Sequence, residues 1–103
     1  MRDPVLTPEE ITQALDQLQG TGWTHRDDLL VRTTRCQGFA GALAYVNAVG
    51  ALAEAADHHP DIDIRWNTVT LALTTHDSGG ITRRDVELAT EIAALRDGQS
   101  ADG

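Results

Sequence analysis

The sequence predicts an α+β fold in which three helices pack on one face of a four-stranded antiparallel sheet, in the order α-β-β-α-β-β-α. Two observations predict it. Three segments repeat apolar residues at helical spacing, and between them lie two pairs of short strand-like runs joined by polar turns. Strands joined by such short turns are antiparallel, and their sheet needs helices to cover its buried face.

The first helix is predicted to begin within Thr7-Pro8-Glu9-Glu10. The threonine can cap it, the proline suits the first helical position, and the second glutamate completes a capping box. Gly20 and Gly22 then end the helix. A hairpin is predicted over residues 23–34, with its polar turn at residues 26–28.

The second helix is predicted over residues 38–56 and ends at residues 57–60, because a residue before proline avoids the helical region. Its apolar residues form a stripe that we expect to face the core: Phe39, Ala42 or Leu43, Val46, Val49 or Gly50, and Ala53. Three glycines lower its helix propensity, which implies that something packs closely against Gly38, Gly41 and Gly50.

The second hairpin is predicted over residues 62–75, because the apolar phase flips at Asn67-Thr68 as it would across a tight turn. A bulge in one long strand would produce the same flip. Trp66 lies on the apolar phase of the first strand and is therefore expected in the core. His76 lies at the end of the second strand on the face opposite the apolar side chains, where it is exposed.

A turn at residues 77–80 precedes the last helix, in which Thr82 is the predicted cap and Asp85 closes a second capping-box pair. Residues 97–103, DGQSADG, are expected to be a disordered tail. A single domain is predicted to span residues 1–103.

The charge of the chain argues against several classes of partner. The formal net charge is −8, which does not suit binding to nucleic acid or to an anionic membrane. Cys36 is the single cysteine, so no internal disulfide can form. The N-terminal residues lack the apolar core of a signal peptide, and no apolar run reaches the roughly 18 residues of a membrane span. A cytoplasmic location is therefore expected.

Three of the four histidines lie in one stretch, residues 57–85. His58 and His59 precede a proline, and His76 follows the last predicted strand. Imidazole exchanges protons near neutral pH, so the stretch predicts a proton-transfer site without a nucleophile.

Two other interpretations of these histidines stay open. Three histidines can hold a zinc ion with one open position, although adjacent residues in an extended loop point apart. The histidines can also be structural or solvated, with Asp57 and Asp77 capping or bonding their neighbours. His25, remote in the sequence, is expected at the surface.

The stretch resembles the pterin-4a-carbinolamine dehydratase family. The resemblance is carried by separated motifs whose types and spacing agree: His58-His59-Pro60, Asn67-Thr68-Val69, Thr75-His76, Gly79-Gly80 and Asp85, with the acidic Glu54 before the histidine pair. It extends more weakly to Gly22-Trp23 and Phe39, and the predicted element order is that of the family.

The resemblance implies dehydration of a 4a-hydroxytetrahydropterin to quinonoid dihydropterin, which recycles the tetrahydrobiopterin-type cofactor of aromatic hydroxylases. It implies no metal and no cofactor. By position, the catalytic residues are His58, His59 and His76, with His59 and His76 doing most of the acid–base work. Substrate-binding or imidazole-orienting roles fall to the acidic side chains Glu54, Asp57, Asp77 and Asp85. Glu54 has a second interpretation, as a solvated helix residue.

The sequence departs from the family pattern at Ile62, where a tryptophan is common, and this affects the expected substrate preference more than the reaction. The runner-up function is a non-catalytic dimerisation or assembly-chaperone module on the same fold, which would not need the histidines. Open sheet edges and an Ala/Gly-rich helix indicate self-association, and the resemblance implies a homodimer or homotetramer.

Overall fold

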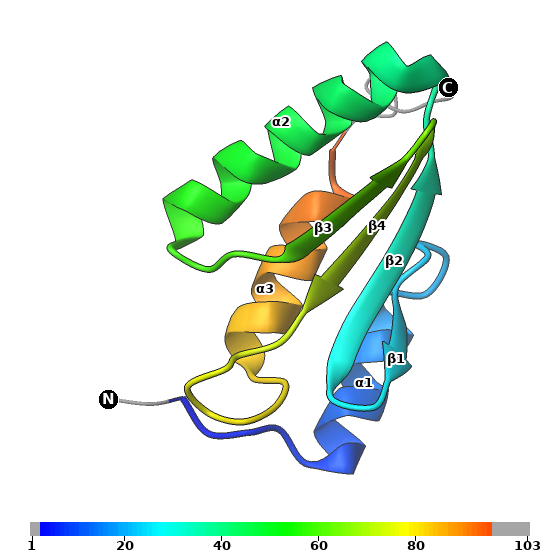
Figure 1. The fold of residues 1–103 in the computed structure, drawn as a ribbon. Coiled ribbons are helices and arrows are strands. Elements are labelled where there is room, and N and C mark those ends of the chain that lie inside the picture. Colours follow the sequence, from blue (N-terminus) through cyan, green and yellow to red (C-terminus); the bar gives the residue numbers. More distant parts are fainter. Residues whose placement is uncertain (1–2, 96–103) are drawn as a thin grey trace.

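A computed structural model describes residues 3–95 and confirms the predicted fold and element order (Figure 1). The predicted tail, residues 97–103, lies outside the described residues. The elements are α1 (Pro8–Gln17), β1 (Thr24–Arg26), β2 (Leu29–Arg35), α2 (Gly38–Ala56), β3 (Asp61–Arg65), β4 (Thr68–Leu73) and α3 (Arg83–Ala93).

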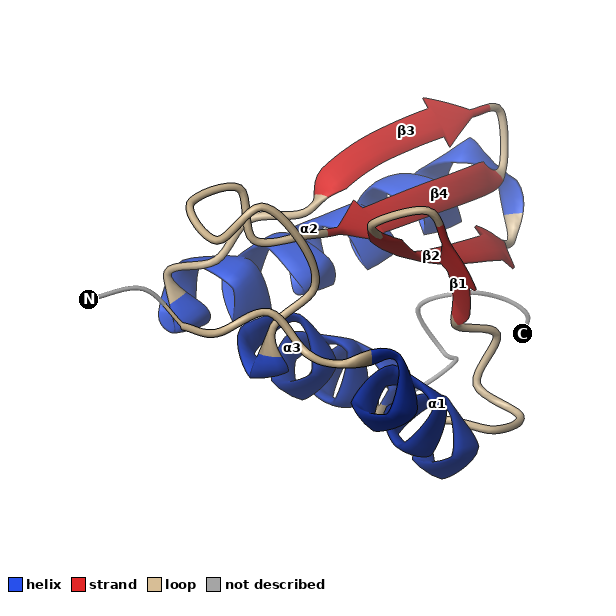
Figure 2. Cartoon of the chain, turned by 90° about the horizontal axis from the view of Figure 1, so that it is seen from below, coloured by secondary structure: helices blue, strands red, loops and turns tan. Residues whose placement is uncertain are grey.

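The four strands form one antiparallel sheet in the order β1-β2-β4-β3. The two hairpins are joined through β2 and β4, whose register pairs Leu30 with Leu73 and Arg35 with Thr68. β1 and β3 are consequently the edge strands of the described sheet. The helices cover one face, with α3 and α1 running below the sheet in the view of Figure 2.

The core lies between this helical face and the sheet. β4 alternates as predicted, because Val69, Leu71 and Leu73 are fully buried while the residues between them are partly exposed. The same core includes Val49 of α2, together with Leu88 and Ile92 of α3 and Leu30 of β2. Burying such side chains is the main favourable contribution to folding.

The predicted capping boxes are both present. Thr7 Oγ1 accepts from the Glu10 backbone N–H at 3.1 Å, and the Glu10 carboxylate accepts from the Thr7 N–H at 2.8 Å. Thr82 and Asp85 form the equivalent pair at the start of α3. These caps satisfy backbone N–H groups that a helix leaves unpaired at its start.

The expectation that Trp66 lies in the core is wrong. Trp66 is 69% exposed and occupies the β3–β4 turn, where its φ is +56°. Because β3 is an edge strand, its apolar phase is only partly covered: Ile64 is half-buried and Ile62 is exposed.

The predicted stripe of α2 is partly wrong, because Phe39 is exposed. Of the predicted alternatives, Ala42 rather than Leu43 is buried. The buried residues are Ala42, Tyr45, Val49 and Ala53. Each residue turns a helix by about 100°, so a stripe that includes Tyr45 moves Leu43 to its flank. A side-chain carbon on Gly38 or Gly50 would meet nothing within 4 Å, so the close packing expected there is absent from the described part of the chain.

α2 is long and apolar enough to cross a membrane by length and composition alone, although the core helix of a soluble protein passes the same test. Only 22% of its apolar window is buried inside the chain. Phe39 and Leu43 are the large apolar side chains of α2 that the described residues leave exposed.

Candidate active site

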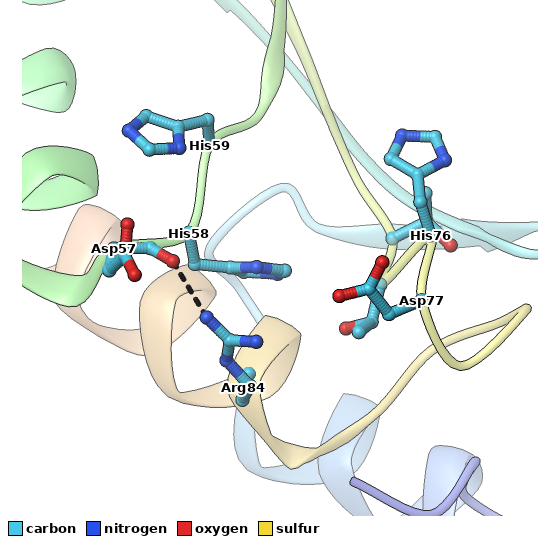
Figure 3. Close-up of a pocket in the computed structure, with 8 residues that line it drawn as sticks. Asp57, His58, His59, His76, Asp77 and Arg84 are labelled. Atoms are coloured by element: carbon cyan, nitrogen blue, oxygen red, sulfur yellow. Dashed lines mark hydrogen bonds between the residues drawn. The ribbon is translucent and has the colours of Figure 1, made fainter. Parts of the chain in front are cut away.

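A pocket of about 240 Å³ opens where the end of α2, the end of β4 and the start of α3 meet (Figure 3). The structure brings all three predicted histidines to it. The lining residues are Asp57, His58, His59, Thr74, Thr75, His76, Asp77 and Arg84.

The end of α2 aims the two adjacent histidines in different directions. Asp57 ends the helix in the left-handed conformation, with φ +52° and ψ +44°. The His58 N–H then bonds back to the Ala53 carbonyl at 3.1 Å. His58 turns inward and is 8% exposed, whereas His59 stays at the surface. A non-glycine residue in this conformation is uncommon and is held there by its surroundings.

His58 is held by a buried carboxylate. Its Nε2 lies 2.5 Å from Oδ1 of Asp85, whose side chain is fully buried. The second oxygen, Oδ2, accepts from the Thr75 hydroxyl at 2.8 Å and from the Thr82 backbone N–H at 2.9 Å. Because a carboxylate only accepts, the ring nitrogen that faces it carries a hydrogen, which fixes the orientation of the His58 ring.

His59 has a carboxylate partner of a different kind. Its Nε2 lies 2.6 Å from Oε2 of Glu54, one turn earlier on α2, and both side chains are more than half exposed. Figure 3 shows the His59 ring turned toward α2 and away from His76. The His59–Glu54 pair is therefore open to solvent and to a ligand.

His76 lies on the opposite side of the pocket, in the loop that follows β4, and is exposed as predicted. The backbones of Thr75 and Gly80 pair as an isolated bridge, with the Thr75 N–H 3.0 Å from the Gly80 carbonyl. This bridge closes the loop at its base. Asp77 follows His76 and also faces the pocket.

The predicted acidic residues occupy three different situations. Asp57 and Asp77 line the pocket, and Glu54 reaches it through His59. Asp85 has no exposed surface, so its geometry fits the orienting role and leaves no direct contact with a ligand in this arrangement.

Arg84 belongs to the pocket but to none of the motifs that predict the site. It lines the pocket, and its Nη2 donates to the backbone carbonyl of Asp57 at 2.7 Å (Figure 3). Its Nε lies 3.8 Å from the Asp3 carboxylate. The signal in the sequence was Arg83-Arg84 in the first turn of a predicted helix, where the macrodipole disfavours cations. Such a placement calls for a partner outside the helix.

The arrangement suits proton transfer. The Ser78 hydroxyl donates to the Asp3 carbonyl at 2.5 Å, and Cys36 is buried away from the pocket lining, so neither lines the pocket as a nucleophile. Within residues 3–95, no three His, Cys, Asp or Glu side chains converge as a metal site would require. Imidazoles on both sides of an open pocket can instead give and accept protons.

The sequence profile described as "Pterin 4 alpha carbinolamine dehydratase" matches residues 4–95. A Roseiflexus sp. (strain RS-1) protein is 52% identical over 87 residues, covering 84% of this chain and 91% of that protein. A Nocardia farcinica protein is 46% identical over 95 residues, covering 92% and 98%. Both are provisionally named as pterin-4-alpha-carbinolamine dehydratases.

Solved structures agree with these sequence relatives. The "transcriptional coactivator/pterin dehydratase" of Brucella melitensis superimposes with a TM-score of 0.81 at 30% identity, over 87% of this chain and 96% of that one. A pterin dehydratase-like protein described as a RuBisCO assembly factor shares the fold, with a TM-score of 0.56 at 20% identity over 70% and 83%.

Proposed function

Since the chain belongs to the pterin-4a-carbinolamine dehydratase family, we propose that it converts 4a-hydroxytetrahydropterin to quinonoid dihydropterin and water. The observation that carries the proposal is the gathering of His58, His59 and His76 around one open pocket. The proposed role is the recycling of a tetrahydropterin cofactor in the cytoplasm, by a single domain that spans the chain.

The reaction needs only proton transfers. One group protonates the 4a-hydroxyl as the carbon–oxygen bond breaks and water leaves, and another takes the proton from the adjacent ring nitrogen. His59 and His76 are the proposed pair, because they are exposed and lie on opposite sides of the pocket. His58, held by Asp85, assists from the buried side.

The acidic side chains support this chemistry in two ways. Glu54 orients the His59 ring through the 2.6 Å contact and stabilises it when it is protonated. Asp57 and Asp77 line the pocket and are the proposed acceptors for the amino and ring N–H donors of a pterin.

A stopped-flow assay tests the proposal. A pterin-dependent aromatic hydroxylase generates the 4a-hydroxypterin, and its decay is followed by absorbance with the wild-type protein, His59→Ala and His76→Ala. Wild type is expected to speed the decay, and each variant to lose about 100-fold or more of that acceleration.

The matched control is His25→Ala. It removes an exposed imidazole from β1, an element that does not line the pocket. It is expected to keep full activity. Decay at the spontaneous rate with wild type would overturn the enzyme proposal. Activity lost only on adding a chelator would replace it with a metal-dependent mechanism.

The second candidate function is a binding module on the same fold, because the structurally similar Brucella melitensis protein is described as a transcriptional coactivator as well as a pterin dehydratase. The uncovered α2 surface favours such a role. In that case, binding of a protein partner would survive in His59→Ala and His76→Ala, whereas dehydratase activity would be lost in both variants.

We also propose that the chain self-associates as a homodimer or homotetramer through α2. From Gly38 to Ala53 the helix has no charged residue, and Phe39 and Leu43 are exposed on it. The Cys36 N–H donates to the Asn67 carbonyl at 2.6 Å, which ties the β3–β4 turn to the residues just before α2. Trp66 is exposed in the same turn. An apolar surface that carries no charge of either sign suits a second copy of itself.

A further inference from the structure

Arg84 occupies an unfavourable position in its own helix and a favourable one for a neighbouring helix. It is the second residue of α3, where the positive end of the macrodipole disfavours a cation. α2 has no basic residue in its last turn, where a cation would be stabilising. The Arg84 guanidinium supplies that cation from α3, donating at 2.7 Å to the carbonyl of Asp57, the C-cap of α2.

The residue that Arg84 holds is the one that directs the histidines. Asp57 has a left-handed backbone, and the chain leaves α2 through this residue before it reaches His58 and His59. Within the helix end, the Asp57 and His58 N–H groups bond to the carbonyls of Glu54 and Ala53. A left-handed aspartate persists only where the surroundings fix it. Among the described contacts, the Arg84 hydrogen bond is the one made from another element to the Asp57 carbonyl.

The residues that follow Arg84 and Asp57 in the sequence also contact each other. Asp85 of α3 holds His58 through the 2.5 Å contact, so two consecutive residues of α3 hold two consecutive residues of the loop after α2. One contact fixes the backbone and the other fixes the ring. Two points of attachment leave the loop fewer free rotations than one would.

Arg84 also lines a second cavity. That cavity, again about 240 Å³, is lined by Ala56, His58, Arg84, Glu87, Leu88 and Glu91. Arg84 and His58 are thus shared by the linings of the two spaces.

We infer that Arg84 is a positioning residue of the dehydration site: its guanidinium fixes the Asp57 carbonyl and through it the directions of His58 and His59. This inference rests on the proposed function and adds a residue to it. Arg84 is not assigned a proton-transfer step, because its guanidinium stays protonated in proteins.

The test compares two neighbouring arginines. Arg84→Met keeps the aliphatic stem and removes the donors, whereas Arg83→Met removes an arginine that is 67% exposed and pairs with Glu87 at 3.1 Å. In the stopped-flow assay, Arg84→Met is expected to lower kcat about tenfold with little change in KM, since misaligned groups slow the chemical step. Arg83→Met is expected to match wild type, and Arg84→Lys to recover part of kcat.

A second readout does not depend on activity. Long-range ¹H–¹⁵N spectra of the histidine rings should show altered His58 and His59 signals in Arg84→Met, unchanged His25 signals, and wild-type spectra in Arg83→Met. If wild type is inactive but these ring shifts occur, the dehydratase proposal fails while the positioning of the histidines by Arg84 stands.

Several outcomes would overturn the inference. Wild-type kcat and ring signals in Arg84→Met would show that the contact positions nothing. A rise in KM at constant kcat would show that the guanidinium binds substrate directly. If Arg84→Met does not fold, Arg84→Gln replaces it; failure of both to fold would assign Arg84 a purely structural role.

Discussion

The two ends of α2 differ in how many contacts the rest of the chain makes with them. At the C-terminal end, Arg84 bonds the Asp57 carbonyl and buried Asp85 bonds His58. At the N-terminal end, Phe39 and Trp66 are 49% and 69% exposed. The pocket end is thus arranged by contacts within one chain, whereas the other end has apolar surface for which the described chain provides no cover.

The two ends of α2 thus meet different requirements, those of a binding pocket and those of an interface between chains. A catalytic pocket must hold its groups before the substrate arrives, which needs internal hydrogen bonds. An interface anchor is instead buried only in the complex, and exposed aromatic residues are typical of such anchors. The same helix therefore serves a preformed site at one end and a proposed contact between chains at the other.

The largest effect is expected from breaking the buried network at the pocket end. Asp85→Ala should lower the free energy of unfolding by about 3–5 kcal/mol, because it leaves His58, Thr75 and the Thr82 N–H without their acceptor. Urea denaturation followed by tryptophan fluorescence measures this. Asp63→Ala, which removes an exposed partner of Arg65, is the control. A loss below about 1 kcal/mol would contradict the importance of the network.

The second-largest effect is expected on self-association of the chain through the N-terminal part of α2. Leu43→Glu should reduce the proposed oligomer to a single chain of 11.1 kDa, because it places a charge on the uncharged surface of α2. Light scattering coupled to size exclusion gives the mass. Gln13→Glu adds the same charge to an exposed position of α1 and should leave the mass unchanged. A wild-type mass for Leu43→Glu would place the interface elsewhere.

A smaller effect is expected from the β3–β4 turn. Trp66 has a φ of +56°, which glycine adopts without strain and alanine does not. Trp66→Gly should therefore be more stable than Trp66→Ala by about 1 kcal/mol. Denaturation measured at a concentration where both are monomers tests this. Equal stabilities would mean that the turn relaxes when the indole is removed.

The smallest effect is expected at the exposed pair. Glu54→Gln should change the free energy of unfolding by less than about 0.5 kcal/mol, because the pair with His59 is largely solvated. Its kcat should fall by less than that of Arg84→Met, since the amide can still accept from the ring. Thermal melts and the stopped-flow assay report the two quantities. A stability loss as large as that of Asp85→Ala would contradict the distinction between the two histidine partners.

The elements that local sequence patterns define were predictable. Thr7 and Thr82 were recognised as caps because a capping box needs only residues three positions apart. The bounds of α2 followed from its glycine start and the proline after its end. The three histidines were placed together because one hairpin separates them, and hairpin ends meet.

The errors arose where tertiary context decides. Periodicity gives the presence of an apolar face but not its exact direction, so Tyr45 was missed from the buried stripe and Phe39 was wrongly included. Trp66 is exposed because the β3–β4 turn begins at it, one residue before the predicted turn at Asn67-Thr68. Arg84 was missed because its partner, Asp57, is 27 residues away.

The bridge between Thr75 and Gly80 has a consequence for how the site can be altered. Because the loop is closed at its base, extra residues inserted after Ser78 would lengthen the excursion without moving Thr75 or the start of α3. His76 and Asp77 would remain at its beginning. The loop is therefore a place where evolution or engineering can change the mouth of the pocket, and with it the range of admitted ligands, while the groups below keep their places.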